Sequence, residues 1–166
     1  MFNTIASFCS ILGVLFAFWQ IYRMNNKLKS TQKALKQLRA VFENQKIEVI
    51  LNKISSQQEE LVNVVSNMAK KGRSERKTQQ KLQSIVHDLN KCNNELPETY
   101  KEISDGLERA IKEMQKALDP ELVDVKSQRD HLLDADFFLK NCIHGLKDAV
   151  AKNLDHTINE IARANK

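Results

Sequence analysis

The chain has 166 residues, a net charge of +5, four glycines, two prolines and three cysteines. This length allows one domain beside an N-terminal segment, and the scarcity of turn residues and of alternating apolar patterns excludes a mainly β fold. Three widely spaced cysteines exclude a disulfide framework and indicate reduced thiols.

The N-terminal run from Phe2 to Tyr22 contains no charged side chain, and Arg23 ends it. At a rise of about 1.5 Å per residue, a helix of this length reaches about 31 Å, which matches the hydrocarbon core of a bilayer. Trp19 and Tyr22 stand at the charged end, where amphipathic rings favour the headgroup layer. We therefore predict a single transmembrane anchor over residues 1–23. A cleaved signal peptide would need a basic start, and a buried core helix would need a polar face.

The basic residues are concentrated directly after this run. The first 39 residues carry six basic and no acidic side chains, whereas the rest carry 20 basic and 21 acidic ones. Because basic residues are retained on the cytoplasmic side, we predict an external N-terminus and a cytoplasmic body. This local charge suits anionic lipid headgroups better than nucleic acid. The predicted headgroup contacts are Arg23, Lys27, Lys29, Lys33, Lys36 and Arg39.

Small residues recur along one stripe of the anchor, at spacings of four, three and four. Small side chains let two helix backbones approach closely in lipid, so this stripe predicts a self-association face and a homo-oligomer. The alternative is that such residues are simply common in transmembrane helices, and a strict Gly-x-x-x-Gly is absent. The residues of the face are Ala6, Ser10, Gly13 and Ala17.

The segment 24–71 reads as one long helix with two apolar seams at four-three spacing, separated by a phase change. The first seam consists of Met24, Leu28, Thr31, Leu35, Leu38 and Phe42. The second consists of Ile47, Leu51, Ile54, Gln58, Leu61, Val65 and Met68. We expect Gly72 to end this helix and Ser74 to cap the next.

Three further helices follow, at about 75–95, 98–118 and 121–163, with hinges near 70–77, 93–97 and 119–120. Asp119-Pro120-Glu121 is a helix-start pattern, so we expect the last helix to begin there. The predicted fold of residues 24–166 is an all-α, long antiparallel helical bundle of three arms, with Pro97 kinking or splitting the middle arm. A four-helix count is equally compatible, and an extended parallel coiled coil between protomers is the alternative.

No pattern predicts an enzyme or a cofactor site. The glycines are isolated, no two histidines lie four residues apart, and the basic stretch 70–81 lacks aromatics for base stacking. The nearest approach to a metal cluster is Asp130, His131, Asp134 and Asp136, for which we expect a solvated acidic face instead. Phe137 and Phe138 are adjacent in a chain with few aromatics; we expect both to fill the core, and the alternative for one is a partner-binding spot.

The stretch Phe16–Arg23 and the Lys-rich helix after it resemble many bacterial single-pass proteins with an N-terminal anchor. This resemblance points to no particular family. The resemblance implies a bacterial inner membrane protein. We predict a membrane-anchored coiled-coil scaffold or adaptor that self-associates and binds a cytosolic protein partner. The alternative is an effector whose oligomerised anchors permeabilise the bilayer, in bacterial defence or stress response; the absence of an ionisable residue in the span weakens it.

Overall fold

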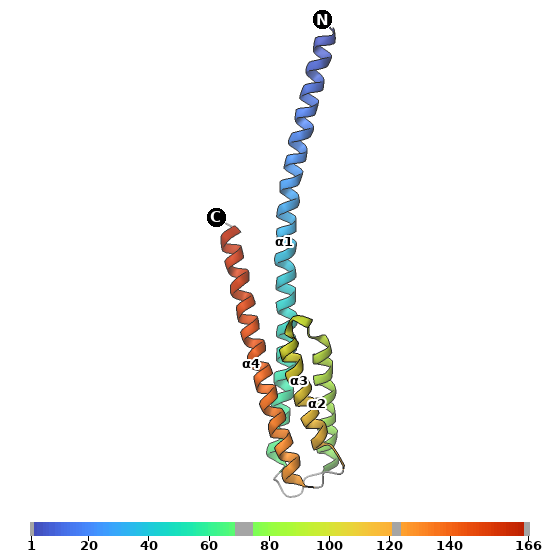
Figure 1. Ribbon diagram of the computed structural model, residues 1–166, viewed down its shortest axis with the longest axis vertical. Helices are drawn as coiled ribbons and strands as arrows, with labels where there is room; N and C mark the ends of the chain where they lie inside the picture. Colours follow the sequence, from blue (N-terminus) through green and yellow to red (C-terminus); the bar gives the residue numbers. More distant parts are fainter. Residues whose placement is uncertain (1, 69–74, 121–123, 165–166) are drawn as a thin grey trace. The chain divides into compact units, whose positions relative to one another are not determined.

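The computed structural model describes residues 2–68, 75–120 and 124–164, with the side chains of 2–15, 156, 157 and 160–164 outside the description. All four long elements are α-helices: α1 (Phe2–Asn67), α2 (Glu75–Glu95), α3 (Lys101–Ala117) and α4 (Val125–Ala164). A short 3-10 turn, η1 (Glu98–Tyr100), precedes α3 (Figure 1). The prediction of an all-helical fold is confirmed.

The chain divides into two compact units, Met1–Phe42 and Glu43–Lys166. The described part of the first unit is a single stretch of helix, the N-terminal part of α1. The second unit contains the rest of α1 together with α2, α3 and α4, and it holds the hydrophobic core.

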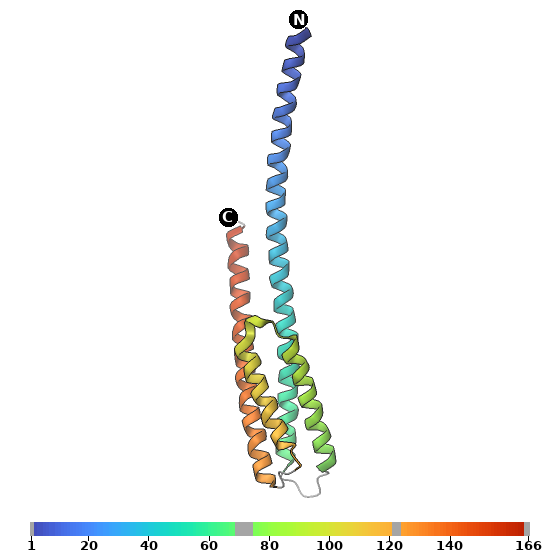
Figure 2. The ribbon, with the colours of Figure 1, turned by 45° about the vertical axis from the view of Figure 1, so that its right-hand side comes forward.

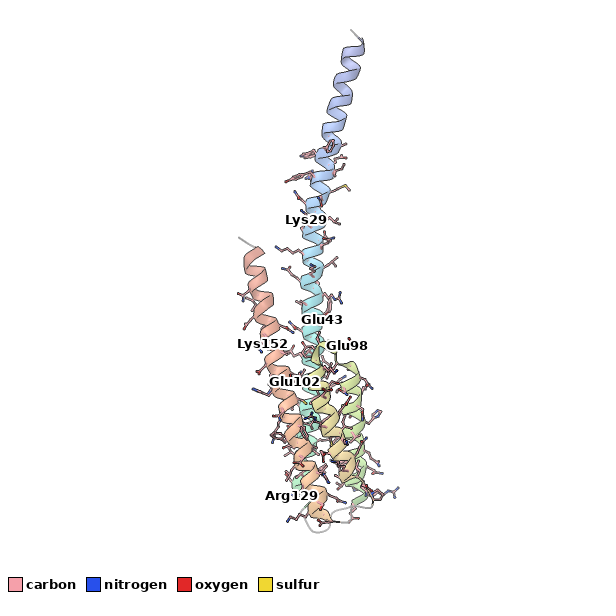
Figure 3. The ribbon with its side chains drawn as sticks, in the orientation of Figure 1. Lys29, Glu43, Glu98, Glu102, Arg129 and Lys152 are labelled. Carbon is pink, nitrogen blue, oxygen red and sulfur yellow. The ribbon has the colours of Figure 1, made fainter. Side chains whose placement is uncertain are left out.

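The second unit is an antiparallel helical bundle in which Pro97 reverses the chain. The peptide before a proline disfavours helix, and α2 accordingly ends at Glu95, with the amide of Leu96 donating to the carbonyl of Asn93. Figures 1 and 2 show the α2–α3 connection at one end of the bundle and the α3–α4 connection at the other. In Figure 3, Glu98 and Glu102 mark the first end and Arg129 the second. The four-helix count is therefore correct: Pro97 splits the middle arm into α2 and α3 rather than kinking it.

The core consists of the apolar seams that the four-three spacing predicts. From α1 the second seam is buried, with Ile47, Ile54 and Leu61 almost inaccessible. α2 contributes Leu82, Ile85, Leu89 and Cys92, and α3 contributes Leu107, Ala110, Ile111, Met114 and Ala117. α4 contributes Leu132, Ala135, Leu139, Cys142 and Leu146. Burial of each large apolar side chain contributes about 1.5–3 kcal/mol, so these seams hold the bundle together.

Polar contacts fix the alignment of α1 with its neighbours inside the bundle. Gln58, the polar member of the second seam, donates from Nε2 to Oδ1 of Asp136 at 2.6 Å. Asp136 is the one buried charged side chain among the described residues, and Lys140 compensates it at 2.7 Å. A buried carboxylate is tolerated only with such partners. The Gln58–Asp136 contact therefore favours this register of α1 against α4 over a slipped one.

The start of α4 differs from the expectation. The helix begins at Val125, and the carboxylate of Asp124 accepts hydrogen bonds from the amides of Lys126 and Ser127 at 3.1 Å and from Oγ of Ser127 at 2.7 Å. These hydrogen bonds lower the pKa of Asp124, and the one from the Ser127 hydroxyl has the largest effect. Asp124, not Asp119, is therefore the N-cap. The predicted caps Gly72 and Ser74 lie outside the described residues.

Candidate interaction site

The largest group of exposed apolar side chains in the described residues lies on α1, in the first unit. Met24, Leu28, Leu35, Leu38 and Phe42 of the first seam are all more than half exposed, and Phe42 reaches 66%. Thr31, the polar member, is also exposed, and its hydroxyl donates to the carbonyl of Lys27 at 3.0 Å. We call these residues, with Ile21 one turn before them, the α1 stripe. A regular apolar stripe exposed over several turns is typical of an interaction surface.

The predicted interfacial and headgroup residues lie on the same part of α1. Phe16 and Trp19 are in ring contact with centroids 5.8 Å apart, and the guanidinium of Arg23 lies 5.3 Å from the centroid of the Trp19 ring. Trp19, Tyr22 and all six predicted headgroup-contact residues are exposed. Figure 3 shows Lys29 on α1, where side chains project from all sides of the helix. The helix thus combines an aromatic segment, basic side chains and the α1 stripe within residues 16–42.

The predicted anchor falls largely on side chains outside the description. Ala6, Ser10 and Gly13 of the self-association face belong to this group, whereas Ala17 is exposed. The backbone of residues 2–22 is helical, as part of α1. Within the part of the chain that the structure describes, no helix meets the length and apolarity required of a membrane span. The anchor and its self-association face therefore stay predictions.

A second exposed apolar feature lies on the bundle, between α3 and α4. Phe138 packs against the core, but Phe137 is 60% exposed, so the expectation that both rings fill the core is wrong. The two rings meet edge to face at 5.9 Å. Phe137 borders a groove of about 570 Å³ that Gly106 and Gly145 help to line. Phe137, Phe138 and Ile103 form the apolar part of this groove, beside the charged side chains of Glu102, Asp105 and Arg109.

Sequence reasoning missed Glu113, which joins the expected acidic cluster from another helix. Its Oε2 lies 2.7 Å from Nδ1 of His131, and with Asp134 these groups place one ligand atom each within 4.8 Å of one another. Lys116 also binds Glu113, at 2.7 Å from Oε1, and this hydrogen bond is the main cause that lowers the pKa of Glu113. Asp136 points instead to Gln58. The contact between Glu113 and His131 joins α3 to α4, and only the alignment of these two helices could reveal it.

The described cysteines are buried thiols rather than nucleophiles. Cys92 and Cys142 are both free, and burial raises the pKa of Cys142 to about 11 and also raises that of Cys92. The thiol of Cys142 lies 3.5 Å from the carbonyl oxygen of Ile103, to which it donates. A raised pKa suppresses the thiolate, which is the reactive form. These residues therefore serve packing between the helices.

Comparison of the chain with protein-family models, with curated proteins and with solved structures gave no match. The α1 stripe, the adjoining aromatic and basic residues and the Phe137 groove are thus the features from which a function is argued.

Proposed function

We propose that this chain is a membrane-anchored helical scaffold or adaptor, with its N-terminus outside and its bundle in the cytoplasm of a bacterial cell. The observation that carries the proposal is the uncharged run Phe2–Tyr22, followed directly by six basic side chains before the first acid. A run of this length suits a bilayer core, and basic residues at one end favour the cytoplasmic face. The anchor would hold the bundle at the membrane, with the basic side chains against anionic headgroups.

The scaffold role is supported by surfaces that suit protein partners. The α1 stripe is exposed over residues 21–42, and Phe137 stands exposed beside the α3–α4 groove. Apolar residues at three-four spacing are the anchors by which helices recognise one another, and aromatic side chains at a groove are frequent centres of binding energy. We assign self-association to the anchor and the α1 stripe, and the cytosolic partner to the Phe137 groove.

In-cell crosslinking through lysines, followed by mass spectrometry, tests this assignment. The scaffold predicts crosslinks from lysines of the bundle to one cytosolic protein. Phe137→Ser should reduce these crosslinks, whereas Val49→Ser, an exposed apolar residue of α1 away from the groove, should leave them unchanged. Equal crosslinking in both variants would remove the groove from the proposal. Loss of membrane potential on expression, without captured partners, would favour the permeabilising effector instead.

A further inference from the structure

The α1 stripe has the register of a coiled-coil seam. With Leu28 at position a of a heptad, the a positions are Ile21, Leu28, Leu35 and Phe42, and the d positions are Met24, Thr31 and Leu38. Six of these seven side chains are large, apolar and more than half exposed. Repeats of apolar a and d positions bury their side chains when helices of the same phase pair side by side.

We propose that residues 21–42 of α1 form a parallel two-stranded coiled coil with the same segment of a second copy of this chain. The orientation rests on the proposed function, because two copies anchored through the same N-terminal run enter the cytoplasm side by side and in the same direction. The proposal goes further than self-association in general, since it names the segment, the partner segment and the register.

The placement of charge allows a second copy to occupy the seam. A basic segment would repel its own copy if its charges flanked the seam, yet Arg23, Lys29, Lys33 and Lys36 occupy the outer b, c and f positions. In a parallel pair each g position faces the e position of the next heptad of the other chain, and these contacts decide pairing. Here they join Lys27 to Gln32, Ala34 to Arg39 and Val41 to Lys46, so no contact joins two like charges.

Two of the four residues of the predicted association face of the anchor lie on this seam, whereas Ala6 and Gly13 fall at the g positions beside it. Ser10 and Ala17 precede Met24, Thr31 and Leu38 at steps of seven residues, so they fall at the same d position. α1 is helical without a break from Phe2 to Asn67, which keeps that phase. Close approach of the anchors along this stripe would therefore bring the a and d side chains of the cytoplasmic segment together.

The seam is also distinct from the stripe that α1 uses inside the bundle. From Phe42 to Ile47 the sequence steps five residues, which breaks the four-three spacing. The residues after the step are buried by the chain's own helices, with Ile47 and Ile50 each 1% exposed, whereas those before it are exposed. One helix thus carries an intramolecular seam after Glu43 and a seam of different phase before it.

Single-cysteine crosslinking in native membranes tests the proposal on the full chain in a Cys9→Ser background, where Cys92 and Cys142 are buried. Met24→Cys and Leu35→Cys place thiols on the seam, and Asn26→Cys and Lys33→Cys place matched thiols at outer f positions, which are also exposed. A disulfide requires the two Cα atoms to lie within about 7 Å. Mild oxidation should shift both seam variants from the 19.1 kDa monomer to a dimer of twice that mass and leave both f variants monomeric.

Each other pattern overturns the pairing. An antiparallel pair cannot bring residue 24 to residue 24 and also residue 35 to residue 35, so a dimer at only one seam position refutes the parallel register. Monomers at both positions would mean that another helix, such as the end of α4 or a different protein, covers the seam. Equal dimer yields at seam and f positions would indicate random collision. High-speed sedimentation without detergent tests the membrane anchor separately from the coiled-coil pairing. Seam dimers that stay in the supernatant would refute the anchor and retain the pairing.

Discussion

Alanine at Gly106 and alanine at Gly145 should change the stability of the bundle in opposite directions. Both glycines lie within helices at the α3–α4 contact, where glycine is less favourable than alanine by about 0.8–1 kcal/mol. They differ in what an added methyl group would meet. At Gly106 the new Cβ would lie 2.7 Å from Sγ of Cys142, whereas at Gly145 the nearest atom is Cδ1 of Ile103 at 3.5 Å.

The contact at Gly106 falls well inside the ordinary separation of about 3.5–4 Å between non-bonded heavy atoms. Cys142 has a short side chain, is buried, and donates its thiol to the carbonyl of Ile103, so it cannot move without losing that contact. Overpacking of this kind costs about 1–3 kcal/mol, against a gain in helix propensity of about 1 kcal/mol. We expect Gly106→Ala to destabilise by about 1 kcal/mol and Gly145→Ala to stabilise by about 0.5–1 kcal/mol.

Urea unfolding of the full chain in detergent, followed by far-UV circular dichroism, measures both changes. Combining Gly106→Ala with Cys142→Ala supplies the control, because removal of Sγ takes away the clash and the helix preference for alanine should then be recovered. The two changes should be non-additive by about 0.5–3 kcal/mol. If Gly106→Ala stabilises the bundle as much as Gly145→Ala does, the close approach of α3 to α4 described here is incorrect.

Three further outcomes are expected. Hydrogen bonds from Lys116, which has the larger effect, and from His131 hold the pKa of Glu113 below its usual 4.5. The ionised carboxylate therefore stabilises the fold above pH 4.5, and this stabilisation is lost as the pH falls through the lowered pKa. Unfolding titrations should therefore show wild type and Glu113→Gln converging in acid; a constant gap would contradict this. Burial and the raised thiol pKa values of Cys92 and Cys142 predict that a Cys9→Ser variant reacts slowly with Ellman's reagent at pH 8 when native and fast in urea, so fast native labelling would show that the core opens readily. Gly13→Leu should weaken self-association in a membrane reporter assay, since a large side chain separates the helix backbones, and an unchanged signal would remove the small-residue face.

Four-three spacing was enough to predict the helices and most of the core. Leu82, Ile85, Leu89 and Cys92 occupy one face by sequence and are buried together. The same spacing could not tell which of the two seams of α1 becomes buried, because Leu35 and Leu51 look equivalent in sequence, yet Leu51 is buried and Leu35 is exposed.

Features that depend on pairing between helices could not be read from the sequence. Pro97 marks a break, but a kink and a full reversal have the same local pattern, and long-range packing decides between them. Glu113 and His131 meet because α3 and α4 align in one register, and the exposure of Phe137 follows from the same alignment. By residue type, Asp119 and Asp124 both suit the start of α4. Asp124 becomes the cap because Ser127 donates hydrogen bonds from its amide and its hydroxyl to the Asp124 carboxylate.

The central claim is that lipid surrounds the first two dozen residues. Alkaline carbonate extraction of membranes from cells expressing the full chain tests it directly, with a variant lacking residues 2–22 as the control. The full chain should stay in the membrane pellet until detergent is added, and the shortened chain should be released. Release of the full chain by carbonate alone would contradict the claim, together with the sidedness and the membrane tether that depend on it.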